Sequence, residues 1–461
     1  MPVTMSIILR ENSDSGRGLF ATERILQGKT IFTEQPYAAV VSDAYVASTC
    51  AFCFAPDASS KCAACSSTVY CHRTCQRLDW VDHKPECETL KRVVPHQPGT
   101  TVRLVCRILQ KRHRSPESYD LAISRLQNFK DRFPRDTIEQ FATMSIVVAE
   151  CITHSRCPTP SEMISLFCCL SINAHSITNE ELVNVGVGLY RKHLAMINHS
   201  CRPNVYASFN ASNVVLRTAR VIDKDEELML CYVDIEDAMV ARREALRKQY
   251  LFDCFCDICE GVLNGKETDA RERVHCPSKT CWSSRTTFVD VGAHVKDPRC
   301  QNCTEFSSFW PDMKKDIARG QSLYAEAFGV PDAKATELLL EAEKKLSHHY
   351  DGATDVIRVR RALQDRIIHS ANPDWDLANR VCQDTLKSMS EIHGSCGITP
   401  TQTIQLLKCA KISSLVGTVV ESVKWWQRAF EMTVITHGED HQLTAEARTR
   451  FIEARAMLTQ I

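Results

Sequence analysis

The alternation of hydrophobic and polar residues changes character several times along the chain, and each change predicts a different kind of structure. Near the start, short β-branched and aromatic runs at Lys29–Glu34 and Tyr37–Val41 are bounded by Gly28 and Pro36. Such runs with turn residues at their ends are typical of strands. Residues 1–49 are therefore expected to form the first part of a β-rich domain.

Strand-like patterning returns much later, at Asn213–Ile222 and Glu227–Val233, with a turn-like polar stretch between the two runs. Before it, residues 88–170 carry apolar positions at helical spacing, as in Met144–Ile152. Residues 50–87 are dominated by cysteine. The pattern therefore predicts one β-rich domain that is split by a cysteine-rich module and a helical insertion.

From about residue 311 to the end the pattern is helical, with helix-period runs at Ala335–Leu346, Trp375–Ile392 and Thr403–His437. No strict repeat can be aligned, but helical hairpins stacked like degenerate tetratricopeptide repeats fit this pattern. We therefore expect an α+β multidomain protein in which the split β-rich domain is followed by an all-α C-terminal domain.

Length and charge exclude several classes of protein. A chain of 461 residues has room for roughly two to four domains. Lys plus Arg equals Asp plus Glu at 56 each, so no overall positive field would gather nucleic acid. No stretch reaches the roughly 18 apolar residues of a membrane span, and the N-terminus lacks a charged leader. We expect a soluble, intracellular, monomeric protein without a membrane partner.

The chain has 24 cysteines, and fifteen of them fall into short-spaced groups that suit tetrahedral metal in a reducing compartment. The others, such as Cys106, Cys168 and Cys409, are expected to be small buried apolar residues. Within residues 50–87, a helical pattern at Thr74–His83 places Cys75 and His83 near one face. This segment offers eight ligands, enough for two zinc sites: Cys50, Cys53, Cys62, Cys65, Cys71, Cys75, His83 and Cys87.

Three further motifs point to one chemistry: Asn198-His-Ser-Cys-Arg-Pro-Asn204, Cys231-Tyr232 and Cys254-Phe-Cys-Asp-Ile-Cys259. Together they resemble the SET domain of protein-lysine methyltransferases. The cysteine-rich segment at residues 50–87 narrows the resemblance to the family in which a MYND zinc module interrupts the SET fold. The resemblance covers nearly the whole chain.

The resemblance implies a layout in seven parts. The SET domain would comprise residues 1–49 and a core at residues 171–233, separated by the MYND module at residues 50–87 and a helical insertion at residues 88–170. A post-SET zinc segment would follow at residues 234–260, a zinc-ribbon-like insertion at residues 261–310, and a tetratricopeptide-like helical domain at residues 311–461.

The resemblance also implies how the ligands are shared. In the MYND family the pairs interleave, so one zinc would take Cys50, Cys53, Cys71 and Cys75, and the other Cys62, Cys65, His83 and Cys87. A third site would join Cys201 to Cys254, Cys256 and Cys259, and all these zincs would be structural because every position is a protein ligand. A fourth group, Cys276, Cys281, Cys300 and Cys303, has zinc-ribbon spacing but is absent from the best-known members, so we expect three or four zinc ions.

For the reaction itself, the resemblance implies that Tyr232 is the catalytic residue, aligning methyl, sulfur and amine. Tyr190 and Tyr250 are candidates for the wall of the lysine channel, and His199 is expected to support the fold and contact the cofactor rather than act as a base. The remaining candidates for S-adenosylmethionine binding are Gly16, Arg17, Gly18, Asn173, Asn198 and Phe252, the last by stacking on adenine.

Two departures from the family pattern bear on these roles. Asp225 stands where the family usually has Gly in a Gly-Glu-Glu-Leu turn, and Asp tolerates a positive φ better than most residues. The stretch from Tyr190 to Asn198 is one residue longer than usual and lacks the Pro that often follows the Tyr. We therefore expect the turn at Asp225 to survive, and leave the register of Tyr190 open.

Three functions compete. The first is an S-adenosylmethionine-dependent protein-lysine methyltransferase of the cytoplasm and nucleus, acting on a protein that presents a lysine. The alternative is an interaction scaffold with an inert SET fold, whose MYND module binds partners such as proline-rich peptides. The presence of Tyr232, Asn198, His199 and Phe252 together favours the enzyme. Zinc-finger binding of DNA is weak, because net charge is balanced and no recognition-helix motif is present.

Overall fold

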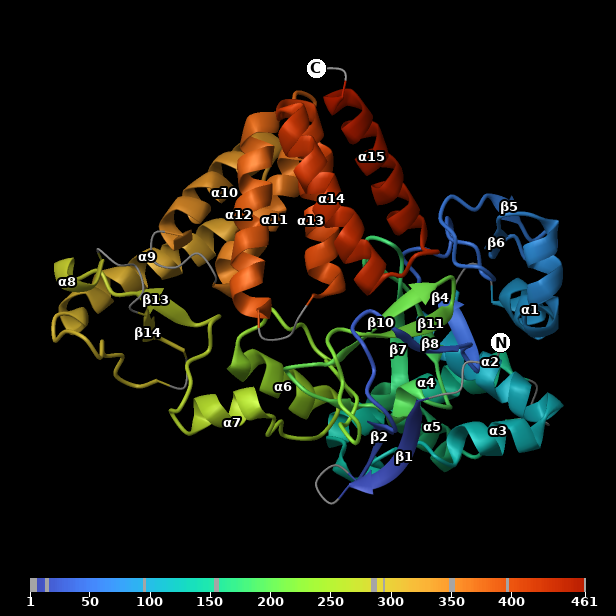
Figure 1. Ribbon diagram of the computed structural model, residues 1–461. Helices are drawn as coiled ribbons and strands as arrows, with labels where there is room; N and C mark the ends of the chain where they lie inside the picture. Colours follow the sequence, from blue (N-terminus) through green and yellow to red (C-terminus); the bar gives the residue numbers. More distant parts are fainter. Residues whose placement is uncertain are drawn as a thin grey trace.

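The computed structural model describes residues 6–12, 16–93, 97–152, 157–282, 288–292, 295–347, 353–394 and 398–459. A β-rich body with helices on one side lies beneath a bundle of long C-terminal helices, and a small zinc-type module projects at one end of the body (Figure 1). A second small module with short strands lies at the opposite end, beside the start of the bundle (Figure 1). The α+β multidomain class expected from the sequence is confirmed.

The β-rich body consists of small sheets whose strands come from both sides of the interrupting modules. Strand β3 pairs antiparallel with β11, and β11 with β10; β4 and β7 both pair antiparallel with β8. Strands β1 and β2 form a hairpin. The bounds are β1 Ile7–Asn12, β2 Gly16–Ala21, β3 Thr30–Glu34, β4 Ala38–Val41, β7 Ala174–Thr178, β8 Asn184–Leu189, β10 Val205–Asn210 and β11 Asn213–Thr218.

The strand expected at Glu227–Val233 is much shorter than the sequence pattern indicates. Within it, β12, Met229–Leu230, pairs in parallel register with β9, Asn198–His199, and Glu227 forms an isolated bridge to Phe20. The backbone N–H of Tyr232 donates to the side chain of His199 instead of to a strand. The strand ends early because the backbone N–H of Tyr232 is hydrogen-bonded to the side chain of His199 in the Asn-His loop.

The cysteine-rich module and the helical insertion lie between β4 and β7. Helix α1 is longer than the predicted Thr74–His83, because it continues through Pro85 to Arg92. The elements are β5 Ser60–Lys61, β6 Val69–Tyr70, α1 Arg73–Arg92, α2 Thr100–Arg114, α3 Pro116–Ile123, α4 Arg135–Cys151 and α5 Pro160–Asn173. Buried faces of α2, α4 and α5 share one apolar core with the β-rich body, so the insertion is part of that domain.

After the strands of the β-rich body the chain forms α6 Met239–Gln249, α7 Asp257–Leu263 and a small module with β13 Arg273–His275, α8 Lys279–Trp282 and β14 Phe288–Asp290. The C-terminal helices follow as α9 Phe306–Glu326, α10 Asp332–Ser347, α11 Thr354–Ile368, α12 Trp375–His393, α13 Pro400–Val416, α14 Val419–Thr436 and α15 Gln442–Leu458. Successive helices pack against one another around one apolar core, as expected for helical hairpins. The proposed boundary at residue 311 falls inside α9.

The single helix-period run predicted at Thr403–His437 is wrong in one respect, because it forms two helices. The break falls at Gly417, and Thr418 begins the next helix by accepting a hydrogen bond from the backbone of Glu421. Glu421 in turn accepts from the backbone N–H of Thr418. This reciprocal cap, together with the poor helix propensity of glycine, ends one helix and starts the other although the apolar period continues.

The helical domain packs on the sheets of the β-rich body at the end of α14. The guanidinium of Arg217 on β11 donates to the carbonyl oxygens of Val434 and Ile435, both at 3.1 Å. A cation at the C-terminal carbonyls of a helix is favourable because those groups are otherwise unpaired. A Cβ added at Gly28, whose φ is +73°, would lie 3.2 Å from the Cα of Ile435. The two domains therefore approach closely here.

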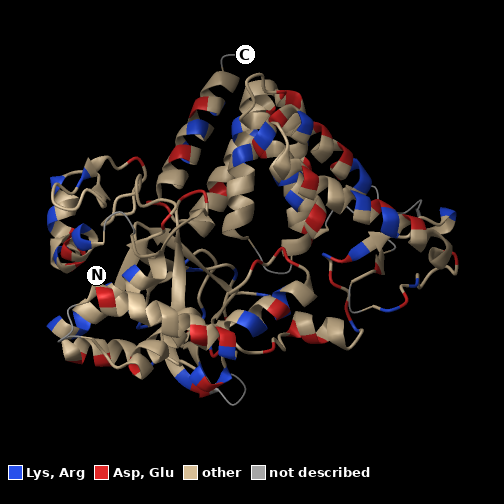
Figure 2. Ribbon diagram, turned by 180° about the vertical axis from the view of Figure 1, so that it is seen from behind, with Lys and Arg blue, Asp and Glu red and all other residues tan. Residues whose placement is uncertain are grey.

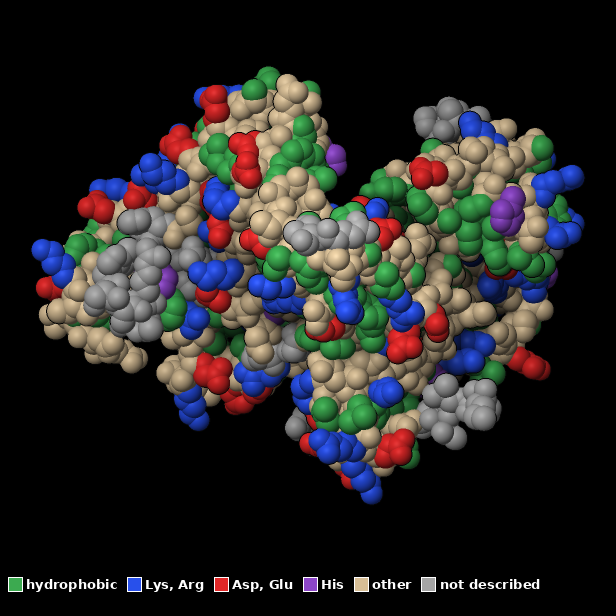
Figure 3. Space-filling model, turned by 45° about the horizontal axis from the view of Figure 1, so that its top comes forward, with side chains coloured by type: hydrophobic (Ala, Val, Ile, Leu, Met, Phe, Trp, Pro, Cys, Tyr) green, Lys and Arg blue, Asp and Glu red, His purple; other side chains and the backbone are tan. Residues whose placement is uncertain are grey.

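Charges of both signs are interspersed along the helices, without a single-sign face in this view (Figure 2). The same mixture of positive, negative and hydrophobic side chains covers the face over the ends of the C-terminal helices (Figure 3). Among the described residues, no helix combines the length and apolar character that crossing a membrane requires.

Candidate methyl-transfer site and zinc centres

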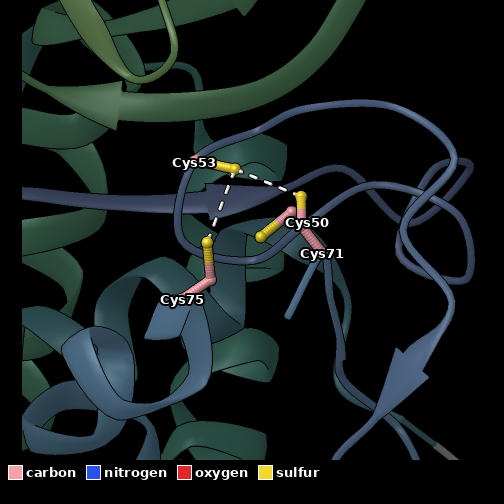
Figure 4. Close-up of side chains that lie close together, drawn as sticks. All are labelled: Cys50, Cys53, Cys71 and Cys75. Atoms are coloured by element: carbon pink, nitrogen blue, oxygen red, sulfur yellow. Dashed lines mark hydrogen bonds between the residues drawn. The ribbon is translucent and has the colours of Figure 1, made fainter. Parts of the chain in front are cut away.

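The first cysteine quartet brings together ligands from two loops and the start of α1. The sulfur atoms of Cys50, Cys53, Cys71 and Cys75 point toward one another (Figure 4). The Sγ of Cys53 lies 3.4 Å from that of Cys71 and 3.8 Å from that of Cys75. A tetrahedral zinc with Zn–S bonds of about 2.3 Å needs sulfurs about 3.8 Å apart. The quartet therefore fits zinc.

The second quartet, Cys62, Cys65, His83 and Cys87, interleaves with the first as the resemblance implied. The Nε2 atom of His83 lies 3.7 Å from the Sγ of Cys65, while its Nδ1 atom lies 3.4 Å from the Glu86 carboxylate. A carboxylate on the outer nitrogen of a histidine ligand fixes the tautomer that binds metal. This module is therefore arranged as a closed structural zinc site.

A buried ion network connects the cysteine-rich module to the β-rich body. Arg107 on α2 contacts the carboxylates of Glu86 at 2.7 Å and Asp79 at 3.3 Å, and donates to the Ala39 carbonyl on β4 at 3.1 Å. Burial alone would raise the pKa of Glu86, but Arg107 and His83 lower it to about 2. The Glu86 carboxylate therefore stays charged at neutral pH and remains in contact with the Nδ1 atom of His83.

The third quartet joins Cys201, just after β9, to Cys254, Cys256 and Cys259 at the start of α7. The Sγ atoms of Cys201 and Cys259 are 3.6 Å apart. The fully buried guanidinium of Arg242 donates to the Cys201 sulfur at 3.3 Å, as expected beside thiolates. A metal here would hold the segment that carries Phe252 against the Asn-His loop.

The fourth quartet, Cys276, Cys281, Cys300 and Cys303, also gathers its sulfurs around one point. Two of the separations are 3.5 Å, between Cys276 and Cys303, and 3.9 Å, between Cys281 and Cys300. These cysteines form a small apolar cluster with residues of β13, β14 and α9, among them Phe306. The geometry of this fourth quartet suits zinc as well as the geometry of the other three quartets does.

The Asn-His loop and the glycine-bearing strand β2 meet in a tight crossing. The side-chain nitrogen of Asn198 donates to the Arg17 carbonyl at 2.6 Å and to the Glu227 carboxylate at 2.7 Å. A Cβ at Gly18 would lie 2.1 Å from the Glu227 oxygen and 3.1 Å from the Asn198 nitrogen. Only glycine fits here without displacing Glu227. Gly16 lies at the start of the same strand with φ +84°.

Tyr232 lies in an aromatic cluster on the other side of the same crossing. Its ring centre is 5.3 Å from that of His199, 4.8 Å from Tyr250 and 6.5 Å from Phe252. Its hydroxyl donates to the carbonyl of Ile197, just before the Asn-His pair. Burial raises the pKa of the Tyr232 phenol above its usual range, with Tyr250 adding to the shift. The phenol is therefore neutral at physiological pH.

His199 accepts the backbone N–H of Tyr232 on Nδ1 at 3.0 Å, and its Nε2 atom lies 3.4 Å from the sulfur of Cys201. The Nδ1 atom must be unprotonated to accept, so the proton resides on Nε2 and is directed at the sulfur. Both ring nitrogens are thus engaged with protein atoms. The supporting role expected of His199 stays a prediction.

Two of the candidate residues lie apart from this cluster. Asn173 ends α5 and uses its side-chain nitrogen to bind the carbonyls of Gln127 at 2.8 Å and Cys169 at 2.7 Å. Tyr190 is fully buried, its ring against those of His175 and Phe209. Their roles in cofactor binding and in the lysine channel stay predictions. Asp225 has φ +66°, so the expected turn is present.

Sequence reasoning missed two residues of the site. Glu227 orients Asn198. In the sequence, the acidic pair that precedes β12 is the pattern that could have indicated this residue. Arg242 supports Cys201 from α6. No local pattern distinguishes Arg242 from the other basic residues of its helix, because its partner lies 41 positions earlier in the chain.

Comparisons with known proteins agree with this geometry. The SET domain family model matches residues 16–233. The histone-lysine N-methyltransferase ASHR1 of Arabidopsis thaliana is 27% identical over 96% of this chain and 94% of its own length. Human histone-lysine N-methyltransferase SMYD3 is 26% identical, covering 93% of this chain and 92% of its own. The N-lysine methyltransferase SMYD2 of Gallus gallus is 31% identical over 55% of this chain and 59% of its own.

A solved structure, the SET domain of LSMT bound to lysine and AdoHcy, aligns over 95% of this chain and 91% of its own at 11% identity and a TM-score of 0.28, too low to support an argument. The strands that carry the Asn-His crossing, the match to the SET model and the relatives along nearly the whole length define a SET-domain protein. With its interleaved Cys/His quartets between β4 and β7 and relatives along nearly its whole length, the chain is similar to the SET and MYND family of protein-lysine methyltransferases.

Proposed function

We propose that this protein transfers a methyl group from S-adenosylmethionine to lysine side chains of a protein substrate, with Tyr232 as the catalytic residue. The observation that carries the assignment of residues is the parallel pairing of β9 with β12. That pairing brings Asn198 and His199 beside Tyr232, which follows 33 positions after His199. The cofactor candidates on β2 join them through the contact between Asn198 and Arg17.

The residues of the chain address the main obstacle to the reaction, which is the proton on lysine. With an unperturbed pKa of about 10.4, fewer than about one lysine in a thousand is neutral at pH 7. An aromatic enclosure disfavours the ammonium form by desolvation, and the raised pKa of Tyr250, to about 12, reflects such burial. The rings of Tyr232, Tyr250 and Phe252 thus favour the neutral amine.

S-adenosylmethionine, when bound, supplies a methyl group on a positively charged sulfur; a C–N bond to lysine forms as the C–S bond breaks, leaving S-adenosylhomocysteine. Gly18, Asn198 and Phe252 would hold the cofactor. The neutral Tyr232 phenol would orient the amine through its oxygen, and would not act as a base because its pKa is raised. The closed zinc quartets would hold the fold and activate no water.

A radiolabelled methyl-transfer assay on a whole-cell protein extract tests the proposal, comparing the native chain with Tyr232→Phe. The matched control is Tyr324→Phe, whose ring lies on α9 against Phe328. We expect the native chain and the control to label protein lysines, and Tyr232→Phe to lose most labelling while binding S-adenosylhomocysteine with unchanged Kd. No labelling by any of the three would support the scaffold instead. Full labelling by Tyr232→Phe would remove Tyr232 from catalysis.

A further inference from the structure

The short segment immediately after Tyr232 is held from several directions at once. The carbonyl of Ile235 accepts from the guanidinium of Arg271 at 2.6 Å. The next carbonyl, that of Glu236, accepts from the hydroxyl of Thr354 at the start of α11. The carbonyl of Asp237 accepts from Arg242, the residue that also binds the Cys201 sulfur. Successive peptide groups are thus fixed by Arg271 just before β13 of the second small module, by the helical domain and by α6.

The carboxylate of Glu236 makes the strongest of these attachments. Arg361 on α11 binds both of its oxygens, at 2.5 Å and 2.8 Å, and His393 at the end of α12 lies 3.2 Å from one of them. Bidentate pairs of this kind fix orientation as well as supply energy. The Glu236 side chain is 6% exposed and that of His393 is fully buried. Although burial would raise it, His393 and Arg361 lower the pKa of Glu236 below its usual value.

The same helix makes a second, weaker attachment, because Arg358 pairs with the carboxylate of Asp237. Between Tyr232 and Glu236 the chain forms a turn in which Asp234 accepts the backbone N–H of Glu236 at 2.9 Å. A turn closed by this hydrogen bond restricts the movement of its residues relative to one another. A displacement of Glu236 would therefore pass to Tyr232, four positions earlier.

On its other side, Tyr232 is held at the Asn-His crossing by the side chain of His199 and the carbonyl of Ile197. We propose that Glu236 is a positioning residue through which Arg361 and His393 of the C-terminal helical domain hold Tyr232 in the geometry for methyl transfer. The proposal rests on the function proposed above. In this proposal the helical domain contributes to catalysis by holding Tyr232 in place, without contacting the substrate.

The test compares Arg361→Gln with Arg366→Gln in the full-length chain. Both substitutions are on α11, but Arg366 pairs with Asp332 and donates to the Ala327 carbonyl, which both belong to the helical domain. We expect Arg361→Gln to lower kcat by on the order of tenfold or more, with an unchanged Kd for S-adenosylhomocysteine, since small misplacements of reacting groups are costly. Arg366→Gln should keep the native kcat. Arg361→Lys, which retains the charge without the bidentate fork, should fall between the two.

A double-substitution cycle distinguishes positioning from loss of stability. Rates are measured well below the melting temperature of each variant, with folding checked by circular dichroism. If Glu236 and Arg361 act as one unit, Glu236→Gln with Arg361→Gln should cost little more than either alone. Additive losses, or a native kcat in Arg361→Gln, would overturn the proposal. Absence of methyl transfer by the native chain would instead refute the proposed function, so the two failures are distinguishable.

Discussion

Replacing Gly18 with alanine should weaken cofactor binding without unfolding the protein. The new Cβ would lie 2.1 Å from the Glu227 carboxylate oxygen. That oxygen is the end of a flexible side chain, so Glu227 can rotate away, but Asn198 then loses its charged acceptor at 2.7 Å. The hydrogen bond from Asn198 to the Arg17 carbonyl remains. The expected damage is therefore the loss of a hydrogen bond that orients the Asn198 amide.

A hydrogen bond to a charged group contributes roughly 1.5–3 kcal/mol, and about 1.4 kcal/mol corresponds to a tenfold change in affinity. Gly18→Ala should therefore raise the Kd for S-adenosylhomocysteine by about 10- to 100-fold, measured by isothermal titration calorimetry. The matched control is Gly329→Ala, where an added Cβ meets nothing within 4 Å. A native Kd in Gly18→Ala, with native stability, would refute the reasoning that Asn198 must be oriented by Glu227.

The remaining predictions concern metal, stability and pH. Metal analysis by mass spectrometry should find four zinc ions per native chain and three after Cys276→Ser, and three in both would show that the fourth quartet binds none. Arg107→Met should lower the free energy of unfolding by about 3–5 kcal/mol, because Glu86 and Asp79 would be left buried without the guanidinium that balances their charge; an unchanged urea midpoint would contradict this. Burial, with His441 and Arg217 nearby, lowers the pKa of His437 to about 3, so the unfolded chain binds the proton more tightly and stability falls as pH drops from about 6.5 toward 3. Between pH 7 and 5.5 the native chain should lose on the order of 1 kcal/mol more than His437→Gln in urea unfolding, and equal losses would exclude His437 as the cause.

The quartets were predictable because short cysteine spacings place two ligands on one turn, whatever the rest of the fold does. The same holds for most helices of the C-terminal domain, where period and caps agree. The break at Gly417 could have been anticipated from the glycine followed by Thr418 and, three positions later, Glu421. The hydrophobic period alone does not reveal this break, because the period continues across it.

Other features depend on partners that no local pattern connects. Glu236 and Arg361 are 125 positions apart, and each alone looks like an ordinary surface charge. The shortness of β12 arises because Tyr232 bonds to His199, a choice made by the crossing of two distant loops. Local propensity carries no information about hydrogen bonds between distant segments, so the pairings that organise this site become visible only in three dimensions.

The pairing of β3 with β11 has a consequence for how the protein is made. Arg217 on β11 lies beside Thr30 on β3, and the two are 187 positions apart. At about 5–20 residues per second, a ribosome needs roughly 10–40 seconds to deliver the second strand after the first. During that interval Ile31 and Phe32, buried in the finished protein, have no partner strand. Until then the nascent N-terminus exposes these apolar side chains, whereas the interleaved cysteine module can close as soon as its own 38 residues emerge.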